Sequence, residues 1–157
     1  MIHADFTKDA GLLWFGNTLV SIPVSFRDGA DGLSVIENWA PFGDSPPLHI
    51  HHTQDELFVV LEGRLRIVQD GEEIILTAGQ RALAPKGVAH TYRVESDGAH
   101  FLAITRGGDF ETMVRRASRK AARADLPPAA APTPEVIAEL TRLCAEARID
   151  FVGPPLM

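Results

Sequence analysis

Short hydrophobic runs with alternating polar positions dominate residues 14–106 of the chain. Within these runs, apolar or β-branched residues recur at every second position, and Gly, Pro, Asp or Asn separates one run from the next. This alternation is typical of β-strands joined by tight turns, and no helical period interrupts it. The pattern predicts an antiparallel barrel or sandwich, with strands that include Leu19–Ser25, Leu33–Trp39, Leu57–Leu61 and Arg64–Gln69.

Two helices are predicted after residue 108, where the hydrophobic period changes. The first covers Asp109–Ala122, because apolar residues recur there at helical spacing between basic ones. The Pro- and Ala-rich segment 125–132 predicts an extended connector. Thr133 and the proline after it supply the start of a second helix, which is predicted to run to about Arg148.

The length of 157 residues fits one ordinary domain. We expect a barrel over residues 1–106 and a C-terminal helical extension over residues 107–157. The extension should pack on the barrel or on a partner subunit, since an isolated amphipathic helix of this length is only marginally stable. Cys144 lies on the apolar stripe of the second helix, which favours a buried hydrophobic role over a nucleophilic one.

The composition excludes several classes of partner. The formal net charge of −6 lacks the basic character that binding to a phosphate backbone requires. No apolar run approaches the roughly 18 residues that a membrane span needs, and no secretory signal pattern opens the chain. We therefore expect a cytoplasmic protein that binds neither nucleic acid nor membrane and acts on a small molecule.

Histidines cluster in the middle of the predicted barrel. Because side chains at i and i+2 of a strand share a face, His49 and His51 can present two imidazoles to one interior point. Glu56 begins the next run, and His90 begins a later one after a predicted tight turn. These four residues are the candidate metal ligands, whereas His52 has the wrong strand parity and is expected to face outward or to support a ligand.

Other residues on the inward positions are candidates for a pocket above the metal. Phe58 and Tyr92 are predicted to line it, together with Val60 and Trp39. The alternative is plain core packing, which is the usual role of aromatic and branched residues on such positions. His3 and His100 have no acidic or histidine neighbour at ligand spacing, and neither is assigned a role.

At these residues the chain resembles the cupin superfamily. The first cupin motif, G(X)5HXH(X)3,4E(X)6G, is matched by Gly43, His49, His51, Glu56 and Gly63. The second motif, G(X)5PXG(X)2H(X)3N, is matched by Gly79, Pro85, Gly87 and His90, with Val94 in place of the usual Asn. The glycines and Pro85 are expected to serve turns, several of them with positive φ.

The resemblance implies an all-β double-stranded β-helix, the cupin jelly-roll barrel, followed here by the two C-terminal α-helices. It also implies one divalent transition metal held by His49, His51, Glu56 and His90. Nitrogen and oxygen donors without thiolate suit Fe, Mn, Ni, Cu or Zn and do not choose among them. Some cupins keep the barrel without the metal, so a barrel without metal stays an alternative.

Within the superfamily, the chain is similar to the small single-domain bacterial cupins related to quercetin 2,3-dioxygenase. That resemblance implies a dioxygenase for a substrate with adjacent hydroxyl and carbonyl oxygens, with Glu56 as the catalytic base. The alternatives are a non-oxidative, metal-dependent isomerase, lyase or cyclase, or a non-catalytic small-molecule-binding barrel. A homodimer is expected, because cupins commonly pair and the outward positions Leu57, Val59 and Leu61 are apolar.

Overall fold

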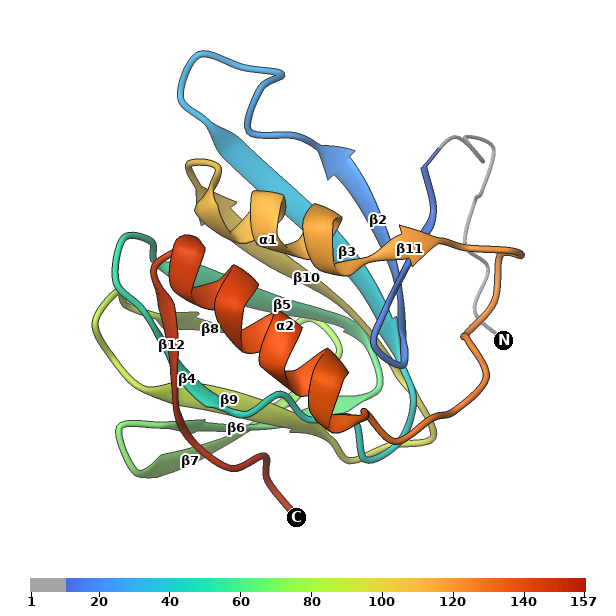
Figure 1. Ribbon diagram of the computed structural model, residues 1–157. Helices are drawn as coiled ribbons and strands as arrows, with labels where there is room; N and C mark the ends of the chain where they lie inside the picture. The colour runs from blue at the N-terminus through green and yellow to red at the C-terminus, as the bar shows by residue number, and fades with distance from the viewer. Residues whose placement is uncertain (1–10) are drawn as a thin grey trace.

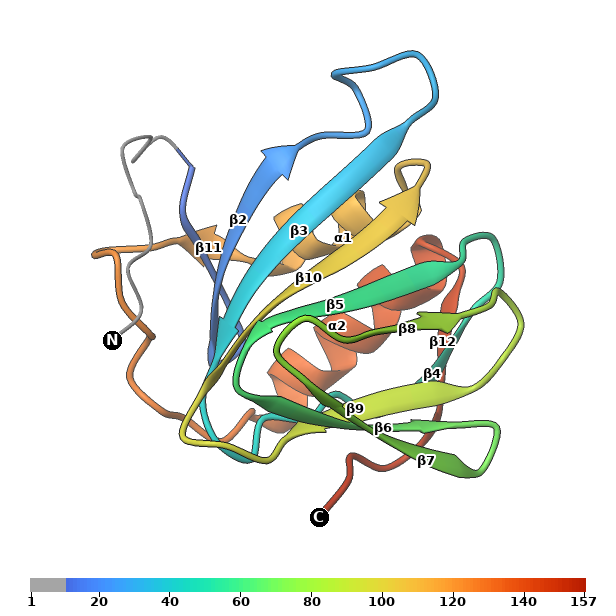
Figure 2. The same cartoon turned by 180° about the vertical axis from the view of Figure 1, so that it is seen from behind.

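The computed structural model describes residues 11–157 and places two antiparallel sheets against each other (Figures 1 and 2). Within these residues, one sheet has seven strands in the order β11-β1-β2-β3-β10-β5-β8, and the other has five in the order β12-β4-β9-β6-β7. The strands of the first sheet are β1 (Leu13–Phe15), β2 (Thr18–Val24), β3 (Leu33–Ala40), β5 (Glu56–Glu62), β8 (Arg81–Ala84), β10 (Ala99–Arg106) and β11 (Arg119–Lys120). Those of the second are β4 (Leu48–His51), β6 (Arg64–Gln69), β7 (Glu72–Thr77), β9 (His90–Val94) and β12 (Ile149–Gly153). The predicted all-β double-stranded β-helix with two C-terminal helices is confirmed.

The alternation of the strands decides which side chains enter the core between the sheets. On β5, Glu56, Phe58 and Val60 are buried, whereas the exposed fraction rises to 38% at the outward Leu61. On β6 the buried positions are Leu65 and Ile67. Burial of one face of each strand against the opposite sheet is the main stabilising contribution, because apolar area leaves water on both sides of the interface.

The first helix is shorter than predicted. It covers α1 (Asp109–Ala117) and not Asp109–Ala122, because Ser118 is extended and residues 119–120 join β1 as strand β11. The Arg119 guanidinium lies over the Trp14 ring, 5.2 Å from its centroid, and this contact favours the strand over further helical turns.

No helix within residues 11–157 has the length and apolar character needed to cross a bilayer.

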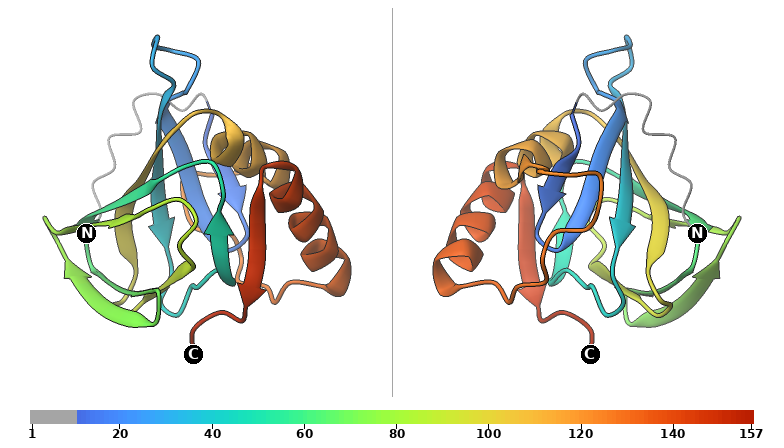
Figure 3. Two further views of the ribbon diagram at one scale, coloured as in Figure 1. Left: turned by 90° about the vertical axis from the view of Figure 1, so that its left-hand side faces the viewer. Right: turned by 90° about the vertical axis from the view of Figure 1, so that its right-hand side faces the viewer.

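The second helix, α2 (Pro134–Glu146), begins as predicted, with the Val136 amide donating to the Thr133 hydroxyl. Both helices lie on one side of the two sheets, beside β12 (Figure 3). Their apolar faces pack against the chain's own strands in one cluster of buried residues, which are Val20, Ile36, Met113, Val114, Leu143, Cys144, Ala147 and Ile149. Residues 107–157 thus contribute two strands, β11 and β12, in addition to the helices.

One buried carboxylate joins α1 to the first sheet. Glu111 is fully buried and accepts hydrogen bonds from the Ser34 hydroxyl (2.7 Å), the Ser25 hydroxyl (2.8 Å) and the Phe26 amide (2.9 Å). Arg115, one turn further along α1, donates to the same carboxylate at 2.9 Å. Burial alone would raise the pKa of Glu111, but these donors outweigh it and lower the pKa below its ordinary value.

Candidate metal centre

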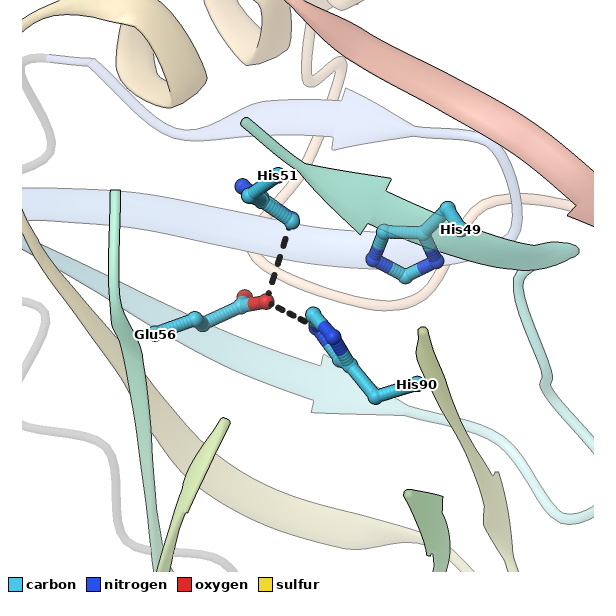
Figure 4. A group of neighbouring side chains, drawn as sticks. All are labelled: His49, His51, Glu56 and His90. Carbon is cyan, nitrogen blue, oxygen red and sulfur yellow. Dashed lines mark hydrogen bonds and ion pairs between the residues drawn. The ribbon is translucent and has the colours of Figure 1, made fainter. Parts of the chain in front are cut away.

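The four predicted ligands come together inside the barrel from three strands (Figure 4). His49 and His51 share the inward face of β4, Glu56 begins β5, and His90 begins β9 directly opposite His49. One potential ligand atom from each residue lies within 4.8 Å of the others, and all four side chains are buried. The cluster has the size and the donor types that one metal ion requires.

The turns around the cluster are built as the motif glycines suggest. Gly63, Gly79 and Gly87 have φ values of 84°, 84° and 82°, in the region that glycine adopts without strain. The Gly87 amide donates to the His51 carbonyl at 2.8 Å, which ties the turn before His90 to strand β4. The predicted turn therefore also fixes the distance between two ligand-bearing strands.

Backbone carbonyls orient two of the three imidazoles. Nδ1 of His49 donates to the Pro47 carbonyl (2.7 Å), and Nδ1 of His90 donates to the Val88 carbonyl (3.1 Å). In both residues this leaves Nε2 directed at the cluster, the arrangement that metal-binding histidines commonly use.

The electrostatics of the cluster suit a cation. Nε2 of His90 donates to Glu56 Oε2 at 2.8 Å, and this carboxylate raises the pKa of His90 against the opposing effect of burial. Burial would raise the pKa of Glu56, but the neighbouring imidazoles of His51 and His90 hold it well below its usual range. Burial and the adjacent His90 lower the pKa of His49 to about 4. Glu56 is therefore ionised and His49 neutral at neutral pH, as metal ligation requires. His90, which donates from both ring nitrogens, must release its Nε2 proton when a metal binds.

His51 differs from the other two histidines. Its Nε2 lies 3.2 Å from Glu56 Oε2, outside hydrogen-bonding geometry, and neither ring nitrogen has a hydrogen-bond partner within residues 11–157. A buried polar atom without a partner costs about 1–3 kcal/mol. A metal ion bound by Nε2 would satisfy one of the two atoms, so the residues present fit a divalent transition metal.

Aromatic side chains continue from the cluster into the core. The Phe58 ring lies 5.9 Å from the His90 ring and 5.9 Å from the Tyr92 ring, between centroids. The Tyr92 hydroxyl donates to Asp44 Oδ2 at 3.4 Å, and Thr18 donates to the same oxygen at 3.2 Å. Asp44 was not predicted to lie here, because an Asp between Gly43 and Ser45, with two prolines after it, is typical of an ordinary turn.

Several other sequence candidates lie away from the cluster. His52 is half exposed and pairs with Asp150 at 2.9 Å. Trp39 was expected to line the pocket but packs with Trp14 and stacks on His100, with the ring centroids 4.7 Å apart. The physical reason is strand parity, since the neighbouring Ala40 belongs to the core that contains Phe58 and Trp39 therefore faces the other way. His3 lies outside the described residues.

Comparisons with known proteins identify the barrel. Residues 35–105 match the Cupin domain family. Quercetin 2,3-dioxygenase from Bacillus subtilis is 30% identical over 95 residues, which cover 60% of this chain and 28% of that protein. The oxidoreductase iacF from Pestalotiopsis fici is 37% identical over 65 residues, covering 41% of this chain and 32% of that protein. The chain thus spans about a third or less of the length of these two relatives.

Solved structures show the same architecture. An RmlC-like cupin from Shewanella frigidimarina superposes with a TM-score of 0.57 at 18% identity, covering 71% of this chain and 96% of that one. The polyketide cyclase RemF from Streptomyces resistomycificus gives a TM-score of 0.55 at 22% identity, covering 68% and 79%. At these identities the likeness concerns the fold alone. Residues 35–105, slightly under half of the chain, thus match the cupin family in sequence, and the fold of the chain is similar to that of solved cupins.

Proposed function

We propose that this cupin is a metal-dependent dioxygenase that acts on a small organic substrate with adjacent hydroxyl and carbonyl oxygens. The observation that carries the proposal is the buried cluster of three imidazoles and one carboxylate within 4.8 Å. The similarity to quercetin 2,3-dioxygenase from Bacillus subtilis supports the choice of reaction, although it covers only part of that enzyme.

A divalent metal held by His49, His51, Glu56 and His90 would supply Lewis acidity and redox chemistry. The chain's own groups would bind the substrate and manage its proton. Glu56, ionised at neutral pH, is the group that can accept the proton of the substrate hydroxyl. Phe58 and Val60, both fully buried, keep water away from this end of the barrel.

Oxygen consumption tests the proposal. Protein reconstituted separately with Fe²⁺, Mn²⁺, Ni²⁺, Cu²⁺ or Zn²⁺ would be mixed with flavonols and other enediol-like compounds in an oxygen electrode. We expect uptake that depends on both metal and substrate, with a cleaved product by mass spectrometry. Product formed without oxygen uptake would instead favour a non-oxidative isomerase, lyase or cyclase reaction at the same cluster. Tight substrate binding without any product would favour a binding module.

Replacing Glu56 by Gln should separate metal binding from catalysis. The amide keeps an oxygen near the metal but cannot accept a proton, so we expect the turnover rate to fall by about 10²–10⁴-fold, the usual contribution of a general base. Metal content, measured by elemental analysis, should fall much less. Glu62→Gln is the matched control because Glu62 lies on the same strand but is exposed. Equal losses of metal and activity in Glu56→Gln would argue against the base.

We also propose that the protein is a homodimer formed through the outer face of the seven-stranded sheet. The exposed fractions of Leu33, Leu61 and Leu83 on this face are 49%, 38% and 51%. Leu57 and Val59 lie between them on the outward positions of β5. A two-fold interface would place these apolar side chains against their copies in a second chain and remove them from water.

Leu83→Arg tests the dimer. The side chain is half exposed, so the fold should tolerate the change, whereas two buried arginines across a two-fold axis would repel each other. Light scattering should give twice 17.1 kDa for the unmodified protein and 17.1 kDa for the variant. Val136→Arg, at an exposed apolar position on α2, should leave the mass unchanged. Unmodified protein that scatters as a 17.1 kDa species would contradict the dimer.

A further inference from the structure

The C-terminal extension, residues 107–157, contacts strand β4, which carries two of the four candidate ligands. β12 pairs with β4 through Ile149 opposite His51 and Phe151 opposite His49. On its other side, β4 shares only the pair His49 and His90 with β9. The backbone position of both ligands therefore depends largely on a strand outside the cupin domain at residues 35–105.

The ring of His51 lacks the hydrogen bond that orients the other imidazoles. Nδ1 of His49 and of His90 is bound to a backbone carbonyl, whereas Nδ1 of His51 is buried without a partner in the described part of the chain. Apart from the contact of Nε2 with Glu56 Oε2 at 3.2 Å, packing must therefore set the orientation of this ring. Outer partners of metal-binding histidines have measurable effects, and their loss typically lowers metal affinity 10–100-fold.

Phe110, in the first turn of α1, provides that packing. Its ring meets the His51 ring nearly edge to face, with centroids 5.2 Å apart and an angle of 69° between the planes. This geometry is the one that aromatic pairs favour. No other aromatic ring outside the ligand cluster is paired with His51 within residues 11–157.

Gln54 fixes Phe110 from the loop between two ligands, His51 and Glu56. Its side-chain oxygen accepts from the Phe110 amide at 2.9 Å, and its amide nitrogen donates to the Arg106 carbonyl at 2.8 Å. Only 4% of Gln54 is exposed. Gln54 also satisfies a first-turn amide of α1, whose N-cap, Gly108, has no side chain to do so. The ligand loop is thus connected to the start of α1 by one partly buried hydrogen bond and to the end of β10 by another.

We propose that Phe110 is a positioning residue for the metal centre, holding the His51 ring so that Nε2 faces Glu56, and that Gln54 holds Phe110 in place. The C-terminal extension then sets the metal affinity of the cupin domain. This inference rests on metal binding by the cluster, as proposed above. The competing explanation is that Phe110 is an ordinary core residue whose loss lowers stability without a specific effect on His51.

Matched phenylalanine variants separate the two explanations. Phe110→Ala and the milder Phe110→Leu would be compared with Phe15→Ala, because Phe15 packs on the same hydrophobic cluster and is not paired with a ligand ring. The dissociation constant for Co²⁺ alone would be measured by competition with a chromogenic chelator. The free energy of unfolding of each metal-free protein would be measured in urea.

We expect Phe110→Ala to raise the Co²⁺ dissociation constant 10–100-fold, with an altered visible spectrum of the bound ion, and Phe110→Leu to raise it less. Phe15→Ala should lower stability without changing the dissociation constant. Phe110→Tyr, which keeps an aromatic ring at this position, should bind Co²⁺ with the affinity of the unmodified protein. Proton NMR of the metal-free proteins adds an independent readout, since loss of the Phe110 ring should shift the His51 ring protons and Phe15→Ala should not.

Three outcomes would overturn the inference. An unchanged dissociation constant in Phe110→Leu, or equal increases in the Phe110 and Phe15 variants, would make Phe110 an ordinary core residue while leaving metal binding intact. Unmodified protein that binds neither Co²⁺ nor Zn²⁺ would instead reject the metal centre itself, and the positioning role with it.

Discussion

Purified protein with His51→Ala is expected to lose its transition metal. A four-ligand site that binds with about 10–16 kcal/mol gains roughly 3 kcal/mol from each ligand, so the loss of one should weaken binding on the order of a hundred-fold. Elemental analysis of the purified proteins would show near-stoichiometric metal in the unmodified chain and little in the variant. Added Co²⁺ should raise the melting temperature of the unmodified protein alone, by mass action.

His52→Ala is the matched control for this experiment. His52 directly follows His51, just after the end of strand β4, but is half exposed and paired with Asp150. We expect its variant to keep full metal content and the same response to Co²⁺. Equal metal content in the His51 and His52 variants would place the metal elsewhere.

Glu111→Ala should be the most destabilising single change outside the cluster. The substitution leaves the Ser25 and Ser34 hydroxyls and the Phe26 amide without their buried acceptor. We expect the free energy of unfolding, measured in urea at pH 7, to fall by about 3–5 kcal/mol. Glu139→Ala on α2 removes only an exposed ion pair with Arg142 and should leave the free energy of unfolding nearly unchanged.

The pH dependence of stability carries a second signature of Glu111. Its pKa in the folded protein lies below the ordinary 4.5, so the unfolded chain takes up the proton first as the pH falls. The stabilising contribution is therefore complete above pH 4.5 and is lost as the pH falls below this value through the folded pKa. Arg115 is the charged group that faces it. Urea titrations at a series of acidic pH values should show that the free energy of unfolding falls less steeply with decreasing pH in Glu111→Ala than in the unmodified protein. Equal slopes in the two proteins would contradict this account.

The sequence predicted the barrel and the cluster of four candidate ligands because both follow from local rules. Strand parity places His49 and His51 on one face, and motif spacing brings Glu56 and His90 to the same point. The prediction for Trp39 was wrong because both faces of β3 carry apolar and polar residues, so the sequence does not reveal which face is inward.

Long-range contacts could not be predicted from the sequence. β12 is a five-residue segment directly after α2, and its role as a strand depends on pairing with β4. The contact between Phe110 and His51 could not be predicted for the same reason. Periodicity placed Phe110 on the apolar face of a helix without showing what that face covers. The hydrophobic pattern of the sequence does not mark Gln54, because its side chain connects two backbone segments that meet only in the folded protein.

The pairing of β12 with β4 has a consequence for the order of events during synthesis. The two strands lie ~100 residues apart, and at about 5–20 residues per second translation needs roughly 5–20 s to pass from one to the other. During this interval, β4 has its histidines but lacks the strand that covers its edge. An uncovered edge can pair with other chains. Metal capture is therefore expected to follow completion of β12, and a ribosome-bound chain stalled before Ile149 should bind Co²⁺ more weakly than the released protein.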